Sequence, residues 1–439
     1  MGFDQFLGNE RIVAALRGML RRDPENLAVS NDHHARAASD SAASVSRTYH
    51  ERDSPHAWRM VAAGFLATFT LFGVVYSFGA FFKPIAAQFG ANRSATSAIF
   101  SITSSISFLL GPFTGHLADR FGPRRIAAIG AVTIGLGLAA TSTIDHLWMA
   151  YITYGFGVGI AIACCYVPLI AAVSGWFLKR RNMALGIAAS GIGVGTLVNA
   201  PVAAELIRRF GWREAYVVMA VFATAMLLIC AWLIEPPPIE LDAPEFSMRR
   251  IVRTRPFKLM YGSCMLWTVA TAIPFVFLPS YAHDVGIKPV AAAALVGFIG
   301  FASTAGRLGL GPLADRFGLM ATYRFCLLVL GLCFAIWLFG KSYGALVAFA
   351  LVMGASYGGA VALTPAVVAE LFGTRGLGVV LGTLYTGSAI AMLLGPPLCG
   401  ALIDRTGNYR TALIFTMAVT VGSYLILRPL ELRETEKHG

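Results

Sequence analysis

A single arginine lies deep inside an apolar stretch of the chain, in the segment GFASTAGRLGLGPLADRFG at residues 300–318. Arg307 precedes the next charged residue, Asp315, by 8 positions, or ~12 Å of helix. A guanidinium near the centre of a membrane helix costs roughly 2.5 to 3.5 kcal/mol, so it should face a cavity or a partner rather than lipid. No Asp, Glu, Lys or other Arg lies at comparable depth in the apolar stretches. We therefore expect Arg307 to bind a substrate carboxylate through paired hydrogen bonds; an arginine extended to the membrane surface is the alternative.

Polar and aromatic side chains in other apolar stretches could surround this ligand. A buried hydroxyl or amide needs a hydrogen-bond partner, and for each such residue a structural bond within the protein is the alternative role. Together they suit a small organic anion that carries an extra hydroxyl, oxo or aromatic group. The expected substrate-binding residues are Arg307, Tyr76, Tyr166, Asn199, Tyr357, Tyr385 and Trp267, with Phe275 near Trp267 at the apolar end of the ligand.

Two charged turns form a second candidate functional site. GHLADRFG at residues 115–122 recurs as GPLADRFG at residues 311–318. Charged groups at such turns can contact the ends of neighbouring helices and favour one of two conformations. A solvated turn that only anchors topology is the alternative. The candidate gating residues are Asp119, Arg120, Arg124, Arg125, Asp315 and Arg316.

The composition indicates a polytopic membrane protein. Hydrophobic residues make up 56% of the 439 residues and charged residues only 13%, against roughly 25% in a soluble domain. The formal net charge of +12 does not indicate a nucleic-acid partner, because most charges lie in short loops between apolar stretches, where they set topology. The basic run Lys179, Arg180 and Arg181 suits a topology signal or an anionic-lipid contact.

Enzyme, cofactor and metal chemistry are not predicted. All seven cysteines fall in apolar stretches without CxxC spacing or a clustered histidine, so we expect neither disulfides nor a metal site. No nucleophile, base and orienting group occur together at membrane depth, and no catalytic residue is assigned. The glycines at residues 155–159 and 191–195 follow no strand, so they are expected to allow close helix packing rather than nucleotide binding.

Membrane helices must position these residues. Twelve apolar stretches of about 20 residues each are long enough to span a bilayer, which predicts an all-α protein of twelve transmembrane helices. Lys and Arg are more frequent in the loops on the side of both termini, which predicts cytosolic ends, although Arg208, Arg209 and Arg213 fall on the other side. The expected spans are 58–82, 94–115, 125–144, 147–174, 183–204, 214–234, 257–282, 289–312, 320–340, 344–369, 376–402 and 411–429.

A repeat with an offset of 196 residues divides the chain into two six-helix halves. The two charged turns correspond at this offset, as do Gly211 and Gly407. Arg307 corresponds to Gly111, so the arginine belongs to one half only. The expected units are an N-terminal half at 58–234, a Pro-rich and then basic cytosolic linker at 235–256, a C-terminal half at 257–429 and a cytosolic tail at 430–439.

Two duplicated halves with GHLADRFGPRR and GPLADRFG resemble the major facilitator superfamily, which assigns these turns a gating role. The resemblance covers residue 58 to the end. It implies two pseudo-symmetric halves that expose a central site alternately to each side of the membrane. WFLKRRNMALGIAASGIGVG at residues 176–195 resembles the helix 5 entry of the monocarboxylate and oxalate:formate transporters, a family that also carries an arginine at the place of Arg307.

The coupling residues of that family are absent. The animal monocarboxylate transporters place an Asp one turn before the arginine, where this chain has Ser303, and a Lys on the first helix, where it has Tyr76. The oxalate antiporter has a Lys on helix 11, whereas the span 376–402 has no charge after its first turn. Proton symport, anion exchange and facilitated diffusion therefore stay open.

Residues 1–57 are polar and rich in Ala, Ser, His and Arg beyond Pro24, which predicts a disordered cytosolic tail. Its first twenty residues resemble the opening of a clamp-loader-type ATPase subunit, but no GxxxxGK[ST] loop follows. A mis-assigned start codon or a fusion scar is the favoured explanation, and an amphipathic surface helix is the alternative. Charges throughout this stretch argue against a signal peptide.

These observations predict a secondary active transporter that moves a monocarboxylate or related small carboxylate by alternating access. We expect a monomer in lipid, in a bacterial inner (plasma) membrane, with protons or a counter-anion as candidate co-substrates. Export of an apolar or cationic compound is one alternative, but it would need a buried acid facing the cavity, and none is visible. A non-transporting sensor of the same fold is the other, and it would bind a ligand without flux.

Overall fold

The computed structural model describes residues 53–177, 180–235, 248–373 and 377–430. The predicted tails, most of the predicted linker and Lys179 lie outside these ranges. Within them, twelve helices are long and apolar enough to cross a membrane, and the structure contains no strand. The predicted all-α class and the predicted number of spans are confirmed.

The first six spans run from Ala57 to Leu233. The first span is broken at Ser77, whose hydroxyl donates to the carbonyl of Val74 at 2.7 Å. The elements are α3 (Ala57–Tyr76), α4 (Phe78–Phe89), α5 (Arg93–Phe121), α6 (Pro123–Ser142), α7 (Leu147–Ala150), the π-helical turn η2 (Tyr151–Phe156), α8 (Gly157–Trp176), α9 (Arg181–Phe210) and α10 (Trp212–Leu233).

The second six spans follow a short helix, α11 (Met248–Ile251). Six of the twelve spans extend three or more residues beyond the predicted apolar stretches, because backbone hydrogen bonds continue past the point where hydropathy falls. The elements are α12 (Arg255–Asp284), α13 (Pro289–Phe317), α14 (Leu319–Leu332), α15 (Phe334–Phe339), α16 (Tyr343–Phe372), α17 (Leu377–Thr406) and α18 (Arg410–Leu427).

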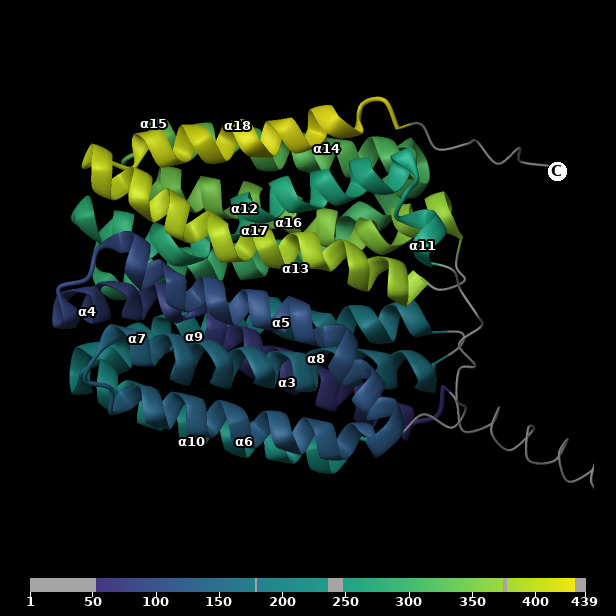
Figure 1. The fold of residues 1–439 in the computed structure, drawn as a ribbon, viewed down its shortest axis with the longest axis horizontal. Helices are drawn as coiled ribbons and strands as arrows, with labels where there is room; N and C mark the ends of the chain where they lie inside the picture. The colour runs from purple at the N-terminus through teal and green to yellow at the C-terminus, as the bar shows by residue number, and fades with distance from the viewer. Residues whose placement is uncertain (1–52, 178–179, 236–247, 374–376, 431–439) are drawn as a thin grey trace, which may run out of the picture.

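The helices form two groups that lie side by side, with α3 to α10 in one group and α12 to α18 in the other (Figure 1). The described chain enters, leaves and passes between the groups at one end of the bundle, on the right of Figure 1. We call this the linker end, and we call the opposite end, where α4 lies, the far end. The groups meet mainly where α5 packs on α17 and α9 packs on α13.

Small residues bring these helices close together. A side chain on Gly193 of α9 would collide with Gly300 and Thr304 of α13, and the Ser105 hydroxyl of α5 donates to the Ala389 carbonyl of α17 at 2.6 Å. Small residues therefore let the backbones of the two groups approach each other closely. The predicted close-packing role is confirmed for Gly193.

Glycines end the helices that carry the charged turns. Gly122 follows α5 with φ 88° and Gly318 follows α13 with φ 91°. This left-handed region is open to glycine and strained for other residues, so the duplicated turns need glycine at these two positions.

Candidate functional site

A cavity of about 310 Å³ lies between the two groups of helices. Helices α3, α5, α8 and α9 line it from one side, and α12, α13, α16 and α17 from the other. Six of the seven predicted substrate-binding residues lie in this lining, which the structure brings together from distant parts of the chain: Arg307, Tyr76, Tyr166, Tyr357, Tyr385 and Trp267.

Arg307 is the cation of the cavity. Among the described lining residues it is the only Asp, Glu, Lys, Arg or His. Its Nη1 atom donates to the carbonyl of Ala189 at 3.1 Å, which joins α13 to α9 in the other group. Its buried Nε atom has no hydrogen-bond partner in the described part of the chain. The side chain therefore lines the cavity and contacts a carbonyl of the other group.

Four tyrosines surround this guanidinium. The hydroxyls of Tyr76 and Tyr357 lie 3.5 Å apart, although the two residues come from opposite groups. Tyr76 and Tyr166 lie near enough to Arg307 for its charge to act on their hydroxyls. Tyr357 and Tyr385 line the same cavity.

Asn199 lies outside the cavity lining. Its Nδ2 atom donates to the Gly195 carbonyl one turn earlier in α9, at 2.9 Å, and its amide packs against Gly73 of α3. Asn199 thus makes a structural hydrogen bond within its own helix, as in the alternative given for it above. Phe275 also lies behind the lining, where its ring stacks on Tyr76.

The sequence did not single out the aliphatic hydroxyls of the cavity. Several of them donate to main-chain carbonyls, as Thr271 does to Thr268 at 2.8 Å and Ser107 does to Thr103 at 2.8 Å. These hydroxyl oxygens keep lone pairs for other donors. The signal was their helical spacing, since residues three or four apart share a face. The set is Ser104, Ser107, Thr268, Thr271, Thr364 and Ser388.

Equivalent positions of the two halves contribute side chains of different size to the site. At the offset of 196 residues Arg307 corresponds to Gly111, and Ala189 corresponds to Tyr385. Gly111 and Tyr385 both line the cavity. At each of these two pairs of equivalent positions, one half has a large side chain and the other half has a small one. Arg307 is equivalent to Gly111, and Tyr385 is equivalent to Ala189. The cavity is therefore asymmetric.

The far end is closed by polar contacts that join the two groups. Asp284 at the end of α12 accepts from Lys83 at 2.5 Å and from the Tyr409 hydroxyl at 2.9 Å. Arg93 lies 3.7 Å from both Asp284 and Asp404. The main-chain N–H groups of Arg93 and Ser94 also donate to Asp404, at 3.3 and 3.1 Å. This last carboxylate therefore lies at the N-terminus of α5, where the helix dipole favours negative charge.

We call these residues, Lys83, Arg93, Asp284, Asp404 and Tyr409, the far-end latch. The sequence does not pair these residues, because their contacts join the ends of different helices at separations of 125 to 311 residues. In the described part of the chain, every ion pair that joins the two groups lies in this latch.

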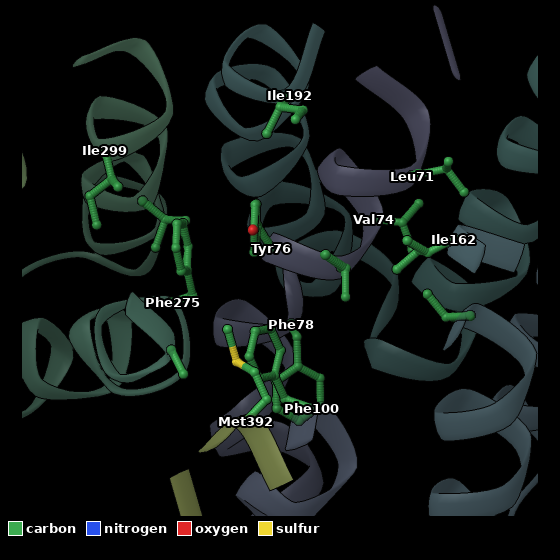
Figure 2. Close-up of a cluster of buried hydrophobic side chains, with 14 of the residues drawn as sticks. Leu71, Val74, Tyr76, Phe78, Phe100, Ile162, Ile192, Phe275, Ile299 and Met392 are labelled. Carbon is green, nitrogen blue, oxygen red and sulfur yellow. The ribbon is translucent and has the colours of Figure 1, made fainter. Parts of the chain in front are cut away.

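Aromatic rings close the same end beneath the latch. Tyr76 and Phe275 stack with ring centroids 3.9 Å apart and an interplanar angle of 12°, and Phe82 meets Phe277 edge-on at 5.4 Å. Figure 2 shows Tyr76 and Phe275 facing each other from neighbouring helices within the buried apolar cluster. Each ring pair joins one group to the other, so the cavity has no polar path toward the far end along these side chains.

The charged turns lie at the linker end. Arg120 and Arg316 occupy equivalent positions and each lies over the ring of the next residue, at 5.3 Å from Phe121 and 5.5 Å from Phe317. The described side chains of the predicted gating set, Arg120, Arg124, Arg125, Asp315 and Arg316, are exposed and take part in none of the ion pairs between the described residues.

The structure does not describe the Asp119 side chain, so its predicted contacts lie outside the described part. The cavity lining itself reaches Gly378, the second residue of α17 at the linker end. The latch and the ring pairs thus close one end, while the cavity extends toward the other.

Comparisons with known proteins agree with this architecture. The model of the Major Facilitator Superfamily matches residues 64–341 and 302–439. Monocarboxylate transporter 3 of Rattus norvegicus is 30% identical over 393 residues, which cover 85% of this chain and 79% of that protein. Monocarboxylate transporter 12 of Xenopus laevis is 27% identical over 398 residues, with 83% and 86% covered.

A solved POT family transporter in complex with 5-aminolevulinic acid is 14% identical and has a TM-score of 0.70, with 84% of this chain and 95% of that chain covered. At that identity the likeness concerns the fold alone. The resemblance inferred from the charged turns and from residues 176–195 is confirmed. The chain belongs to the Major Facilitator Superfamily, and within it the chain resembles the monocarboxylate transporters.

Proposed function

We propose that this transporter carries a small organic acid, with the carboxylate bound by Arg307. The observation that carries the proposal is the position of this residue, which is the one charged side chain among the described lining residues of a cavity between two helical groups. The names of the relatives support a monocarboxylate as the class of cargo. A cation without a protein counter-ion in such a place favours an anionic ligand.

The guanidinium has the geometry for this task. Nη1 is occupied by the Ala189 carbonyl, and Nε has no partner in the described part of the chain. A buried donor without a partner costs about 1 to 3 kcal/mol, which a bound acceptor would recover. A carboxylate can accept two parallel hydrogen bonds from one edge of a guanidinium. Tyr76 and Tyr166 line the same cavity, and their hydroxyls would help to orient the ligand.

Transport follows from alternating closure of the two ends. In the described state the far-end latch and the ring pairs join the groups, while the cavity extends toward the linker end. We assign the linker end to the cytosol, because positive charge in loops favours that side. Tilting of one group on the other along α5–α17 and α9–α13 would open the far end. The duplicated turns with Asp119 and Asp315 would then close the linker end. We propose a bacterial inner membrane as the location of the protein.

Replacing Arg307 tests this assignment. Arg307→Ala should abolish uptake of a carboxylate into proteoliposomes, and Arg307→Lys should restore little of it, because an ammonium keeps the charge and loses the planar fork. Arg410→Ala removes an exposed arginine at the far end and is the matched control. Equal amounts of folded protein, checked by size-exclusion chromatography, are needed for each variant. Carboxylate uptake retained by Arg307→Ala would refute the assignment.

The same experiment addresses the other candidate functions. Export of an apolar or cationic compound would need an acid in the cavity, and the described lining residues include none. A sensor would bind the acid without moving it across the membrane. Binding to purified protein together with uptake into proteoliposomes therefore separates a transporter from a sensor.

A further inference from the structure

Resting on the proposed function, we propose that the preferred cargo is a monocarboxylate with an aromatic ring. Arg307 binds the carboxylate, and an aromatic chamber receives the ring. We define this chamber by the lining residues Phe72, Tyr166, Trp267, Tyr357 and Tyr385.

Charge sets the first limit on the ligand. One arginine is the only charged side chain of the described lining, so it neutralises one carboxylate. A second carboxylate would enter the cavity without a cation, and an ammonium group would enter without an acid. A buried charge without a partner is strongly unfavourable. The cavity therefore fits a monoanion better than a dicarboxylate or an amino acid.

Size sets the second limit. The cavity measures about 310 Å³. This volume lies at the lower end of the roughly 300 to 1,000 Å³ found for small-molecule pockets. Pyruvate has six non-hydrogen atoms and would use less of this apolar space than phenylpyruvate, which has twelve. A cavity that holds its ligand closely gains from each apolar contact.

The walls set the third limit. Rings from both groups face the same space. Tyr166 meets Phe72 edge-on with centroids 5.2 Å apart and an angle of 81°, and Trp267 lies 6.5 Å from Tyr357 at 52°. Tyr385 lies 5.8 Å from Phe108. All five residues of the chamber line the same cavity. Aromatic rings prefer partners at 4.5 to 7 Å in offset or edge-on geometry, so a ligand ring in this space can pack against them. The chamber thus offers aromatic surface on several sides.

Phenylpyruvate and pyruvate form the test pair, because they differ only by the phenyl ring. Binding to the purified full-length chain is measured by isothermal titration calorimetry, with phenylalanine as a third ligand. Burial of the ring should make phenylpyruvate bind about 10- to 100-fold more tightly than pyruvate. Phenylalanine should bind at least tenfold more weakly than phenylpyruvate, since its ammonium group has no acid to meet. Equal affinity for phenylpyruvate and pyruvate would overturn the proposal, and so would tighter binding of phenylalanine.

A variant that fills the chamber adds a structural test. Val361 lines the cavity on α16, whereas the next residue, Ala362, is exposed on the outer face of the same helix. Val361→Phe should lower the ratio of phenylpyruvate to pyruvate affinity by at least tenfold. Ala362→Phe, which adds the same ring outside the cavity, should keep the wild-type ratio. A ratio unchanged in Val361→Phe would place the ring elsewhere and contradict the chamber.

Arg307→Ala separates this inference from the function on which it rests. If pyruvate and phenylpyruvate bind equally and both depend on Arg307, the aromatic chamber is wrong and the carboxylate assignment stands. If phenylpyruvate binds as well to Arg307→Ala as to wild type, the assignment of Arg307 is wrong, whatever the ring contributes.

Discussion

At the scale of single residues, the direction of each polar side chain decides whether it reaches the cavity. The sequence identified Arg307 because a charge so deep in an apolar helix is costly wherever it does not have a partner. It could not separate Asn199 from the tyrosines, since all are polar residues in apolar spans. The structure separates them by direction. Asn199 turns back to its own helix, whereas Tyr76, Tyr166 and Tyr357 point at one space.

Arg307 already makes one hydrogen bond between the two groups of helices. The contact between Nη1 and the Ala189 carbonyl joins the two groups across the cavity. A bound carboxylate would lie beside this contact and take up the remaining donors of the guanidinium. On the proposed function, Arg307 would contact both the bound ligand and the α9 carbonyl. Ligand binding would then affect the contact between α13 and α9.

At the scale of elements, the far-end latch joins the two groups in the described state. Its members are partly exposed, with Lys83 and Asp284 at 34% and 37% side-chain exposure, so each ion pair contributes about 0.2 to 1 kcal/mol. Contacts this weak are compatible with the proposed opening of the far end. Burial and the neighbouring Asp284 raise the pKa of Tyr409 to about 12, so its hydroxyl stays protonated and donates to Asp284 throughout the neutral range.

Removing one charge of the latch should expose the cavity from the far side. Asp284→Asn loses the pairs with Lys83 and Arg93, which together contribute roughly 0.5 to 1.5 kcal/mol. Labelling of Ser104→Cys by a membrane-impermeant maleimide, added from the far side, should accelerate about twofold to tenfold. The seven native cysteines are buried, which keeps the background low.

Glu235→Gln is the matched control for this measurement. It removes an acid that pairs with His56 at 2.9 Å within one group, at the linker end, so the labelling rate should stay at the wild-type value. An Asp284→Asn protein that labels no faster than wild type would show that the latch does not hold the far end closed.

Elements also explain why the charge bias of the loops is imperfect. Arg208 and Arg209 pair with Glu205 at 2.5 Å, and Arg213 donates to the carbonyls of Ser142 and Ile144 at 2.8 and 2.9 Å. The pairs with Glu205 lie one turn apart within α9, at a spacing that the sequence already contains. The partners of Arg213 at the end of α6 depend on the packing of helices, which residue counts cannot identify.

At the scale of the whole molecule, the repeat and the apolar spans were enough to predict the fold. Length and hydropathy define each span independently of its neighbours, so the number of helices follows from the sequence alone. The latch and the aliphatic hydroxyls of the cavity were not predicted. They depend on the rotation of each helix about its axis and on contacts between the ends of distant helices, such as Arg93 with Asp404, which a single sequence does not encode locally.

The absence of an acid in the described lining also predicts the transport mode. An empty cavity that closes at both ends would bury the charge of Arg307 without a counter-ion, which is unfavourable. The loaded protein should therefore change conformation faster than the empty one. Proteoliposomes preloaded with unlabelled carboxylate should take up labelled carboxylate about tenfold faster than empty ones. Equal rates, with uptake driven instead by an imposed pH gradient, would indicate proton symport.

The most direct test of the central claim compares an acid with its own amide. Phenylacetate and phenylacetamide have the same shape and differ in the charge that Arg307 is proposed to bind. Calorimetry on the wild-type protein should give a preference for the acid of at least tenfold, and Arg307→Ala should reduce that preference to about one. An acid preference that persists undiminished in Arg307→Ala would contradict the claim that this arginine binds the cargo.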